Sequence, residues 1–129
     1  RKRKHNEDAY ALDEAEGLFI VADGMGGHAA GEVAAKITVE TIGEFIAATR
    51  QKEEATWPLK YNHELLFNSN RLGIAVEKAN ERVMSAVAAQ PWLKGMGTTV
   101  VAGLLNEKIL SLAHVGDSRA YLYRAVQGR

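Results

Sequence analysis

The clearest pattern in the chain is an apolar run that stops at an acidic residue followed by glycines. Residues 18–22 are all apolar, Asp23 follows them, and glycine occupies four of the next eight positions. Such a run bounded by turn residues predicts a buried strand. Because glycine lets other groups approach the backbone, this segment is suited to hold a hard cation or a phosphate. A tight strand-to-helix turn with a solvated Asp23 fits the stretch equally well, since a lone glycine-rich motif is weakly specific.

Two longer stretches have the spacing of helices that are buried on one face. In Ala29–Thr49, apolar residues recur at steps of four, three and four: Ala35, Val39, Ile42 and Ile46. In Asn62–Ala89, an apolar stripe has similar spacing: Leu72, Val76, Ala79, Val83 and Val87. Asn62 is a candidate N-cap and Pro91 a stop signal. The sequence therefore predicts two long amphipathic helices.

The remaining patterned segments have the two-residue period of strands. Asp8–Asp13 and Leu18–Ala22 form a predicted hairpin around an acidic turn. Three further strands form a predicted antiparallel meander: Thr98–Leu105, Ile109–Val115 and Arg119–Tyr123. Because strands and helices are segregated along the chain, the predicted fold class is α+β, with helices covering a sheet.

The predicted hairpin also brings carboxylates together. Glu7 and Asp8 lie at the start of its first strand and Asp23 at the end of its second, and these ends are neighbours in an antiparallel pair. Asp117 lies in the turn between the last two predicted strands. Oxygen ligands of this kind suit Mg²⁺ or Mn²⁺. Taken alone, Asp117 is explained by ordinary turn chemistry.

Composition limits the classes of function. The chain has 16 Lys and Arg against 16 Asp and Glu, so no net charge attracts nucleic acid or an anionic membrane. It has no cysteine, which excludes disulfides, thiolate zinc sites and a cysteine nucleophile. No apolar run has membrane-spanning length and no signal-peptide pattern opens the chain. We expect a single cytoplasmic domain over residues 1–129, without a nucleic-acid or membrane partner.

Four short strings occur in order along the chain: R-x-x-N-E-D-A at 3–9, V-A-D-G-M-G-G-H at 21–28, G-M-G-T-T at 95–99 and V-G-D-S-R at 115–119. Together they closely resemble the N-terminal motifs of the bacterial metal-dependent, type 2C, serine/threonine protein phosphatases. The resemblance covers nearly the whole chain, although residues 50–92 match by pattern and not by motif. It implies a central antiparallel β-sandwich flanked by helical layers, in an α-β-β-α arrangement.

The resemblance also implies how a metal site is built. Asp23 would bridge two Mn²⁺ or Mg²⁺ ions, and Gly24 would lend its backbone carbonyl to one of them. Glu7 would act mainly through metal-bound water, with Asp8 supporting it. Asp117 would contribute to a third, weaker metal site. Two cations lower the pKa of a bridging water and neutralise phosphoryl oxygens, so this ligand set suits phosphate hydrolysis.

The implied reaction is hydrolysis of phosphoserine or phosphothreonine in proteins by a metal-activated water, without a phosphoenzyme. The implied partners are phosphorylated proteins that a serine/threonine kinase has modified. Arg3 would bind the substrate phosphate, because its guanidinium fork matches two phosphate oxygens.

The chain departs from the family pattern in two respects. Some eukaryotic relatives carry a proposed general acid, a histidine, directly after the Asp-Gly pair, where this chain has Met25. We interpret the nearby His28 as a helix-start or packing residue, and His114 as a core or second-layer histidine. Family members also continue beyond the meander into strands that supply two more metal-binding aspartates. We therefore expect this chain to represent the N-terminal part of a catalytic domain.

Other interpretations remain open from the sequence. A non-catalytic module of the same fold would bind phosphorylated partners, although the presence of Glu7, Asp23 and Asp117 together favours an active enzyme. A nucleotide-binding domain is disfavoured because no Lys-Ser/Thr pair follows the glycines. We expect the 129-residue chain to bind metal weakly and to hydrolyse phosphoprotein poorly. An unpaired sheet edge recruits other strands, so we also expect self-association.

Overall fold

The computed structural model describes residues 8–26, 30–50, 67–106, 109–116 and 119–126. In chain order its elements are β1 (Asp8–Asp13), β2 (Leu18–Met25), α1 (Ala30–Ala48), α2 (Phe67–Ala89), a 3₁₀ turn η1 (Pro91–Leu93), β3 (Gly97–Asn106), β4 (Ile109–Gly116) and β5 (Arg119–Val126). The five strands form one sheet in the order β1-β2-β3-β4-β5, and each neighbouring pair is antiparallel.

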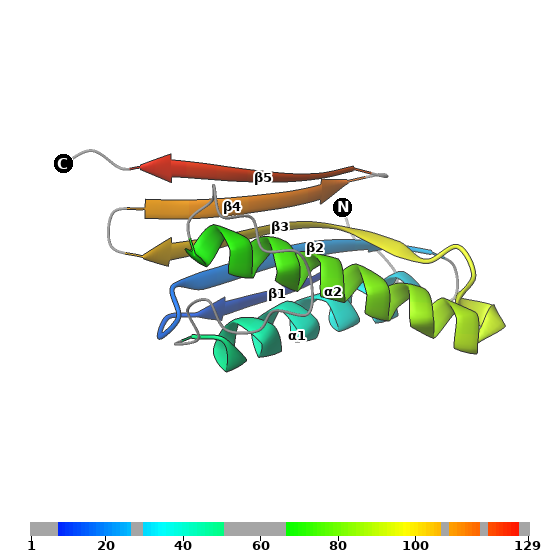
Figure 1. Ribbon diagram of the computed structural model, residues 1–129. Coiled ribbons are helices and arrows are strands. Elements are labelled where there is room, and N and C mark those ends of the chain that lie inside the picture. Colours follow the sequence, from blue (N-terminus) through cyan, green and yellow to red (C-terminus); the bar gives the residue numbers. More distant parts are fainter. Residues whose placement is uncertain (1–7, 27–29, 51–66, 107–108, 117–118, 127–129) are drawn as a thin grey trace.

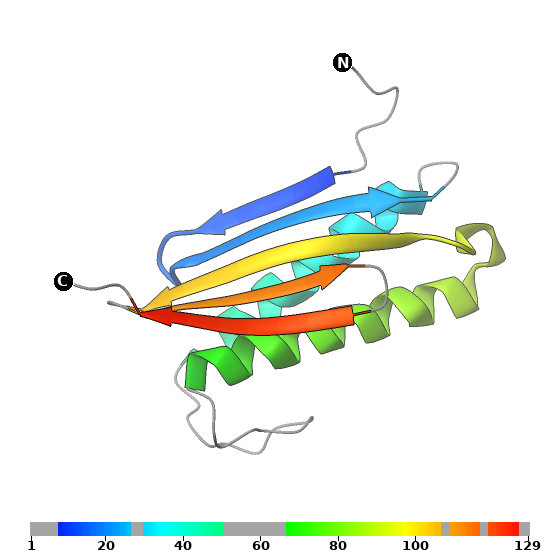
Figure 2. The same cartoon turned by 90° about the horizontal axis from the view of Figure 1, so that it is seen from above.

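Both helices pack side by side on the same face of this sheet (Figures 1 and 2). α1 contacts β1, β2 and β3, whereas α2 contacts β3, β4 and β5. The predicted α+β class is therefore confirmed, as is the placement of two long helices on one sheet face. No helix in the described part of the chain is long and apolar enough to cross a membrane.

Alternation along β2 decides which side chains reach the core. Leu18, Ile20 and Ala22 are buried, while Val21 and Asp23 are exposed on the opposite face. The buried residues of β2 join others from the helices and β3: Ile42, Ile46, Leu72, Val76, Val100, Ala102 and Leu104. The hydrophobic core thus lies between the sheet and the helix pair, as the spacing of the apolar residues predicts.

The sheet face turned away from α1 and α2, called the open face below, has no helix against it among the described residues. Six of its large apolar side chains are exposed: Tyr10, Leu12, Val21, Met25, Val101 and Leu105. Tyr10 is 81% exposed and Leu12 is 70% exposed. The described residues therefore form one sheet and one helical layer of the α-β-β-α arrangement that the sequence implies.

The element boundaries agree closely with the predicted ones at most ends. β1 spans the predicted Asp8–Asp13, and β3, β4 and β5 each contain their predicted strand. α1 lies within the predicted Ala29–Thr49, and α2 ends at the predicted Ala89. Residues 62–66, together with Ala29, lie outside the described residues, so the predicted starts of both helices stay predictions.

Two sequence predictions are wrong. The strand that begins at Leu18 does not end at Ala22 but continues to Met25, because β3 pairs with its last three residues. His114 was predicted to be a core or second-layer histidine, and the core alternative is wrong because its side chain is exposed. The second-layer alternative stays a prediction. Alternation along β4 turns the neighbouring Ala113 toward the core and His114 toward the open face.

A tight turn fixes the β1–β2 hairpin and fastens it to β3. The backbone N–H of Glu16 donates to the carbonyl of Asp13 at 3.2 Å and also reaches its carboxylate, at 3.3 Å. Gly17 has φ of 72°, and its carbonyl accepts a hydrogen bond from the N–H of Leu105 at 2.8 Å. A Cβ atom at Gly17 would lie 2.3 Å from the carbonyl oxygen of Leu105, so only glycine fits this position.

The buried side chain of Arg71 connects this turn to both helices. Its Nη2 lies 3.7 Å from Oε1 of Glu16, whose side chain is also nearly buried. Oε2 of the same carboxylate lies 2.8 Å from Nε of Arg50, but the two groups are not oriented to form a hydrogen bond. Burial lowers the pKa of Arg71, and the nearby Glu16 carboxylate opposes that shift. A charge buried in this way is stable only with a partner of opposite sign.

The remaining donors of Arg71 bind groups at the end of α1 and the start of α2. Its Nη2 donates to the carbonyl of Ile46, which is an otherwise unpaired group of the last turn of α1. Its Nε donates to Oγ1 of Thr49 at 3.1 Å, and its Nη1 donates to Oδ1 of Asn68 at 2.8 Å. The guanidinium also lies 5.5 Å from the ring centroid of Phe67. One side chain therefore holds the hairpin turn and both helices together.

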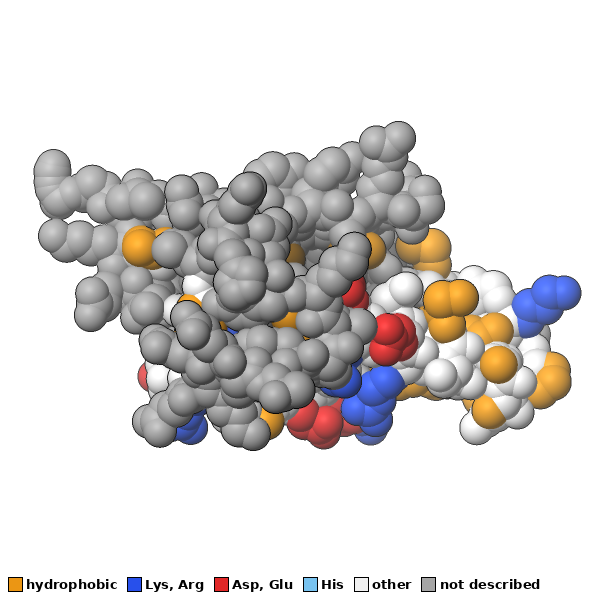
Figure 3. Space-filling model, in the orientation of Figure 1, with side chains coloured by type: hydrophobic (Ala, Val, Ile, Leu, Met, Phe, Trp, Pro, Cys, Tyr) orange, Lys and Arg blue, Asp and Glu red, His pale blue; other side chains and the backbone are white. Residues whose placement is uncertain are grey.

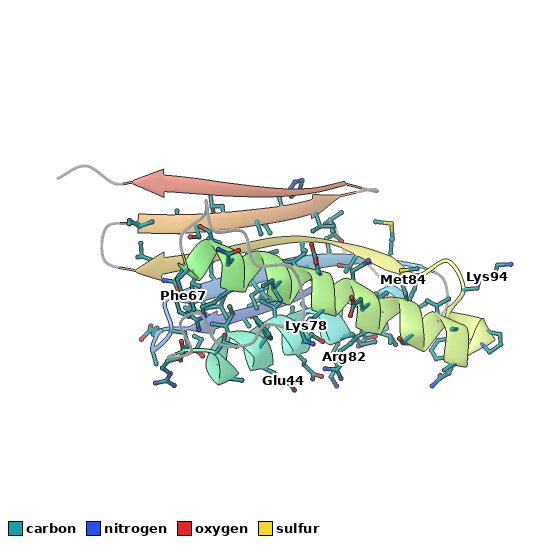
Figure 4. The ribbon with its side chains drawn as sticks, in the orientation of Figure 1. Glu44, Phe67, Lys78, Arg82, Met84 and Lys94 are labelled. Atoms are coloured by element: carbon teal, nitrogen blue, oxygen red, sulfur yellow. The ribbon has the colours of Figure 1, made fainter. Side chains whose placement is uncertain are left out.

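We expect Arg71→Met to destabilise the chain by about 3–5 kcal/mol, because it removes three buried or half-buried hydrogen bonds and leaves the buried Glu16 carboxylate with only the exposed Arg50 as a partner. Arg82→Met is the matched control, since Arg82 forms an exposed pair with Glu44 at 3.5 Å on the helix surface (Figure 4). Loss of an exposed pair costs only about 0–1 kcal/mol. Urea unfolding of the three proteins measures both changes, and equal shifts in the midpoint would contradict the assigned role of Arg71.

Candidate active site

Two carboxylates predicted from the sequence lie directly opposite each other in the sheet. Asp8, the first residue of β1, pairs with Asp23 of β2, and both side chains are exposed. Directly opposed residues on one face have Cβ atoms about 4.5–5.5 Å apart. The two carboxylates therefore lie side by side on the open face, at one end of the sheet.

The short turn of the hairpin produces this pairing. The register runs without interruption from Asp13 opposite Leu18 to Asp8 opposite Asp23. A slip of one residue would turn the side chain of Asp23 toward the helices, because successive side chains of a strand point to opposite faces. The geometry of the turn, five residues from Asp8, thus decides where the carboxylate of Asp23 lies.

β3 supports the same end of the sheet from the other side. Asp23 pairs with Thr99, and the buried Gly24 pairs with Thr98. The expected position of Asp23 at the point where a strand stops is therefore corrected: it lies within a paired strand, two residues before the strand ends. Pairing on both sides restricts the backbone of Asp23 more than a loop would.

Other predicted site residues adjoin, in sequence, the strand ends that lie at the same end of the sheet as Asp8 and Asp23. The sheet end that carries Asp8 and Asp23 also contains the start of β3 and the pair formed by Gly116 and Arg119. In sequence, Glu7 directly precedes Asp8 and Asp117 directly follows Gly116. The residues Arg3, Glu7, His28 and Asp117 themselves lie outside the described residues.

Within the described ranges, no group of three or more His, Cys, Asp or Glu side chains could hold a metal ion. Asp8 and Asp23 form a pair of oxygen donors, the kind that hard divalent cations prefer. The pair therefore fits part of a Mg²⁺ or Mn²⁺ site. The roles assigned to Glu7, Gly24 and Asp117 in such a site stay predictions.

Sequence reasoning missed one feature at this end of the sheet. A cavity of about 410 Å³ lies between the second half of α2 and the start of β3. Met25 and Thr98, the neighbours in space of Gly24, both line it. No periodicity or motif marks a cavity whose walls come from five separate elements, β2, α1, α2, β3 and β4, so only the tertiary structure could reveal it.

Comparison with known proteins decides which family this arrangement represents. Residues 1–128 match the family model described as "Protein phosphatase 2C". The chain belongs to the protein phosphatase 2C family. The resemblance inferred from the four motifs is therefore confirmed.

This phosphatase 2C chain is similar to several bacterial phosphatases. It is 33% identical over 129 residues to the serine/threonine phosphatase stp of Listeria innocua, covering 95% of this chain and 46% of that protein. It is 38% identical over 122 residues to the serine/threonine protein phosphatase PstP of Mycobacterium tuberculosis, covering 95% of this chain and 21% of that protein. The chain thus spans less than half the length of these curated relatives.

Solved structures agree with the fold. The catalytic domain of PstP in complex with two manganese ions superimposes with a TM-score of 0.69 at 33% identity, over 91% of this chain and 44% of that one. A second structure, of Mycobacterium tuberculosis PstP/Ppp, gives a TM-score of 0.68 at 32% identity, over 98% of this chain and half of that one. The α+β architecture of the phosphatase 2C chain is therefore that of solved phosphatases.

We expect Mn²⁺ to raise the melting temperature of this phosphatase 2C chain by a few degrees, because a ligand that binds only the folded state stabilises it. Asp23→Asn should remove most of that shift, since it removes one of two adjacent negative charges. Glu40→Gln is the matched control, because Glu40 is an exposed carboxylate on α1. Differential scanning calorimetry with and without Mn²⁺ measures the shift. An unchanged shift in Asp23→Asn would contradict metal binding at this residue.

Proposed function

We propose that this chain is the N-terminal part of a catalytic domain that hydrolyses phosphoserine and phosphothreonine in proteins. The observation that carries the proposal is the pairing of Asp8 with Asp23 at one sheet end, in a chain of the protein phosphatase 2C family. The relatives named as serine/threonine phosphatases support this reaction. Phosphorylated proteins, the products of a serine/threonine kinase, are the proposed substrates.

Two Mn²⁺ or Mg²⁺ ions are the proposed cofactors, and the solved PstP domain with two manganese ions supports them. Asp23 would hold both ions, Gly24 would contribute its carbonyl oxygen, and Glu7 would act through bound water. Asp117 would contribute to a third site. When bound, such ions lower the pKa of a water and neutralise the phosphoryl oxygens.

The side chains of this chain would bind and orient the substrate around that centre. Arg3 would donate two parallel hydrogen bonds to the phosphate. Asp8 would add a second acceptor beside Asp23, on the same face of the sheet. The two adjacent carboxylates repel a phosphate dianion when no cation is bound, so substrate binding would depend on the metal.

We also propose that the 129-residue chain self-associates. Its outer strands β1 and β5 each pair with one neighbour only within the described sheet. Its open face exposes six large apolar side chains among the described residues. Exposed edges and apolar patches favour association with further polypeptide.

A cytoplasmic location is a further proposal and follows from the sequence composition.

Asp23→Asn in the full-length protein should lower Mn²⁺-dependent turnover by orders of magnitude, because the proposed bridging carboxylate loses its charge. Asp8→Asn should have a smaller effect, of about 10–100-fold, because Asp8 only supports the site. Initial rates of p-nitrophenyl phosphate hydrolysis measure both, and circular dichroism confirms folding. Turnover of Asp23→Asn within a few-fold of the parent would refute the assignment.

Arg3→Ala should weaken binding of a phosphorylated substrate by about 1.5–3 kcal/mol, the value of a hydrogen bond to a charged group. Arg3→Lys should restore only part of this, because lysine lacks the guanidinium fork. The adjacent Lys2→Ala and Lys4→Ala are matched controls and should have much smaller effects. Phosphopeptide KM values measure the changes, and equal effects at all three positions would indicate a diffuse basic patch instead.

A non-catalytic module would give a different set of results. The full-length protein would then bind phosphopeptides without Mn²⁺-dependent turnover, and Asp23→Asn would leave that binding unchanged. Phosphopeptide binding and turnover measured on the same preparation therefore distinguish the two functions.

A further inference from the structure

The cavity beside β3 has the size and the lining of a binding site. Its volume of about 410 Å³ lies within the range of about 300–1,000 Å³ that is usual for ligand pockets. All the residues that line it are uncharged. Val83 and Met96 line it and are nearly fully buried, so an apolar group in contact with them would be partly removed from water. A charged side chain would lose its hydration there without gaining a partner, so the cavity selects apolar groups.

Two of the side chains that line the cavity are exposed methionines. Met25 and Met84 line it and are about half or more exposed, at 48% and 63%. Figure 4 shows Met84 on α2, and apolar side chains are visible toward that end of the helix in Figure 3. Methionine side chains adjust to apolar partners of different shape. Gly97 lies opposite Met25 in the sheet, and a Cβ atom at Gly97 would lie 3.9 Å from Cγ of Met25.

The cavity lies at the same end of the sheet as the two carboxylates, on the side of the sheet that faces the helices. Met25 lines the cavity, yet it lies on the open face two residues beyond Asp23 in β2. Two residues of a strand span about 7 Å. An extended peptide advances about 3.3–3.6 Å per residue. A residue about two positions from a phosphoserine held at Asp23 would therefore reach Met25 and the mouth of the cavity.

We propose that this cavity binds an apolar side chain of the substrate polypeptide, close in sequence to the phosphorylated residue. The proposal rests on the proposed phosphatase function and adds a preference among phosphoproteins. Met25 forms the boundary between the phosphate site and the apolar pocket. Val83, Met84 and Met96 form the walls, and Gly97 lies opposite Met25.

The test compares two peptides of equal charge on the full-length protein with Mn²⁺. Both carry a non-hydrolysable phosphonate analogue of phosphoserine, flanked on either side by two leucines in one peptide and by two serines in the other. Isothermal titration calorimetry should show the leucine peptide binding about tenfold or more tightly, as expected for burial of an apolar side chain. Equal affinities would overturn the proposal and would mean that the cavity holds another segment or ligand.

Two glycine variants test whether the preference for the leucine peptide arises at the cavity. A Cβ atom at Gly97 would contact only a Met25 side-chain atom at 3.9 Å, so Gly97→Leu fills the entrance without displacing the backbone. Gly43→Leu is the matched control, because a Cβ atom at Gly43 of α1 meets nothing within 4 Å. Gly97→Leu should abolish the leucine preference and Gly43→Leu should keep it. A preference retained in Gly97→Leu would place the apolar contact elsewhere and refute the proposal.

A third peptide separates failure of the pocket from failure of the proposed function. It has the leucine sequence with unmodified serine in place of the phosphonate. If the leucine peptides bind equally well with and without the phosphonate, the proposed phosphate site fails while the apolar pocket stands. If both phosphonate peptides bind equally and more tightly than the unmodified one, the phosphate site stands and the pocket fails.

Discussion

The register of the β1–β2 hairpin is the constraint on which the candidate site depends. Strand side chains alternate between two environments, so pairing Asp13 with Leu18 also decides that Asp8 and Asp23 meet on the open face. The same register sends Leu18, Ile20 and Ala22 into the core. Any shift that removed the carboxylates from that face would also expose the core residues of β2. Burial of the apolar residues therefore stabilises the position of the polar ones.

At the opposite end of the hairpin, contacts of Arg71 hold the turn against both helices. Its guanidinium contacts Glu16 in the turn, the last turn of α1 and the first turn of α2. The hydroxyls of Ser69 and Ser111, 2.8 Å apart and fully buried, add a polar contact between α2 and β4. Such contacts have directional requirements that apolar packing lacks, so they define one relative position of helices and sheet. The cavity, in contrast, lies between α2 and β3 at the end of the sheet that carries Asp8 and Asp23.

Local patterns predicted the elements but not the relations between distant ones. Asp8–Asp13 was predictable because a two-residue period and an acidic turn suffice to define a short hairpin strand. The extension of β2 to Met25 was not, because its pairing partner Gly97 lies about seventy residues later. The burial of Arg71 and the exposure of His114 were also inaccessible, since both depend on which elements pack together. Asp8 beside Asp23 was predictable because the two residues belong to one hairpin, whereas Arg3, Glu7 and Asp117 rest on motifs alone.

The strand order has a consequence for how this chain folds. Every strand pairs with its neighbour in sequence, and three of the four pairings join strands across a short turn. The pairing of β2 with β3 is different, because α1, α2 and their connections lie between them. Closing so long a loop is entropically costly and slows folding, whereas a hairpin forms in about 1–10 μs. We therefore expect the sheet to assemble from two locally formed parts, β1–β2 and β3–β5, with their union as the slow kinetic step.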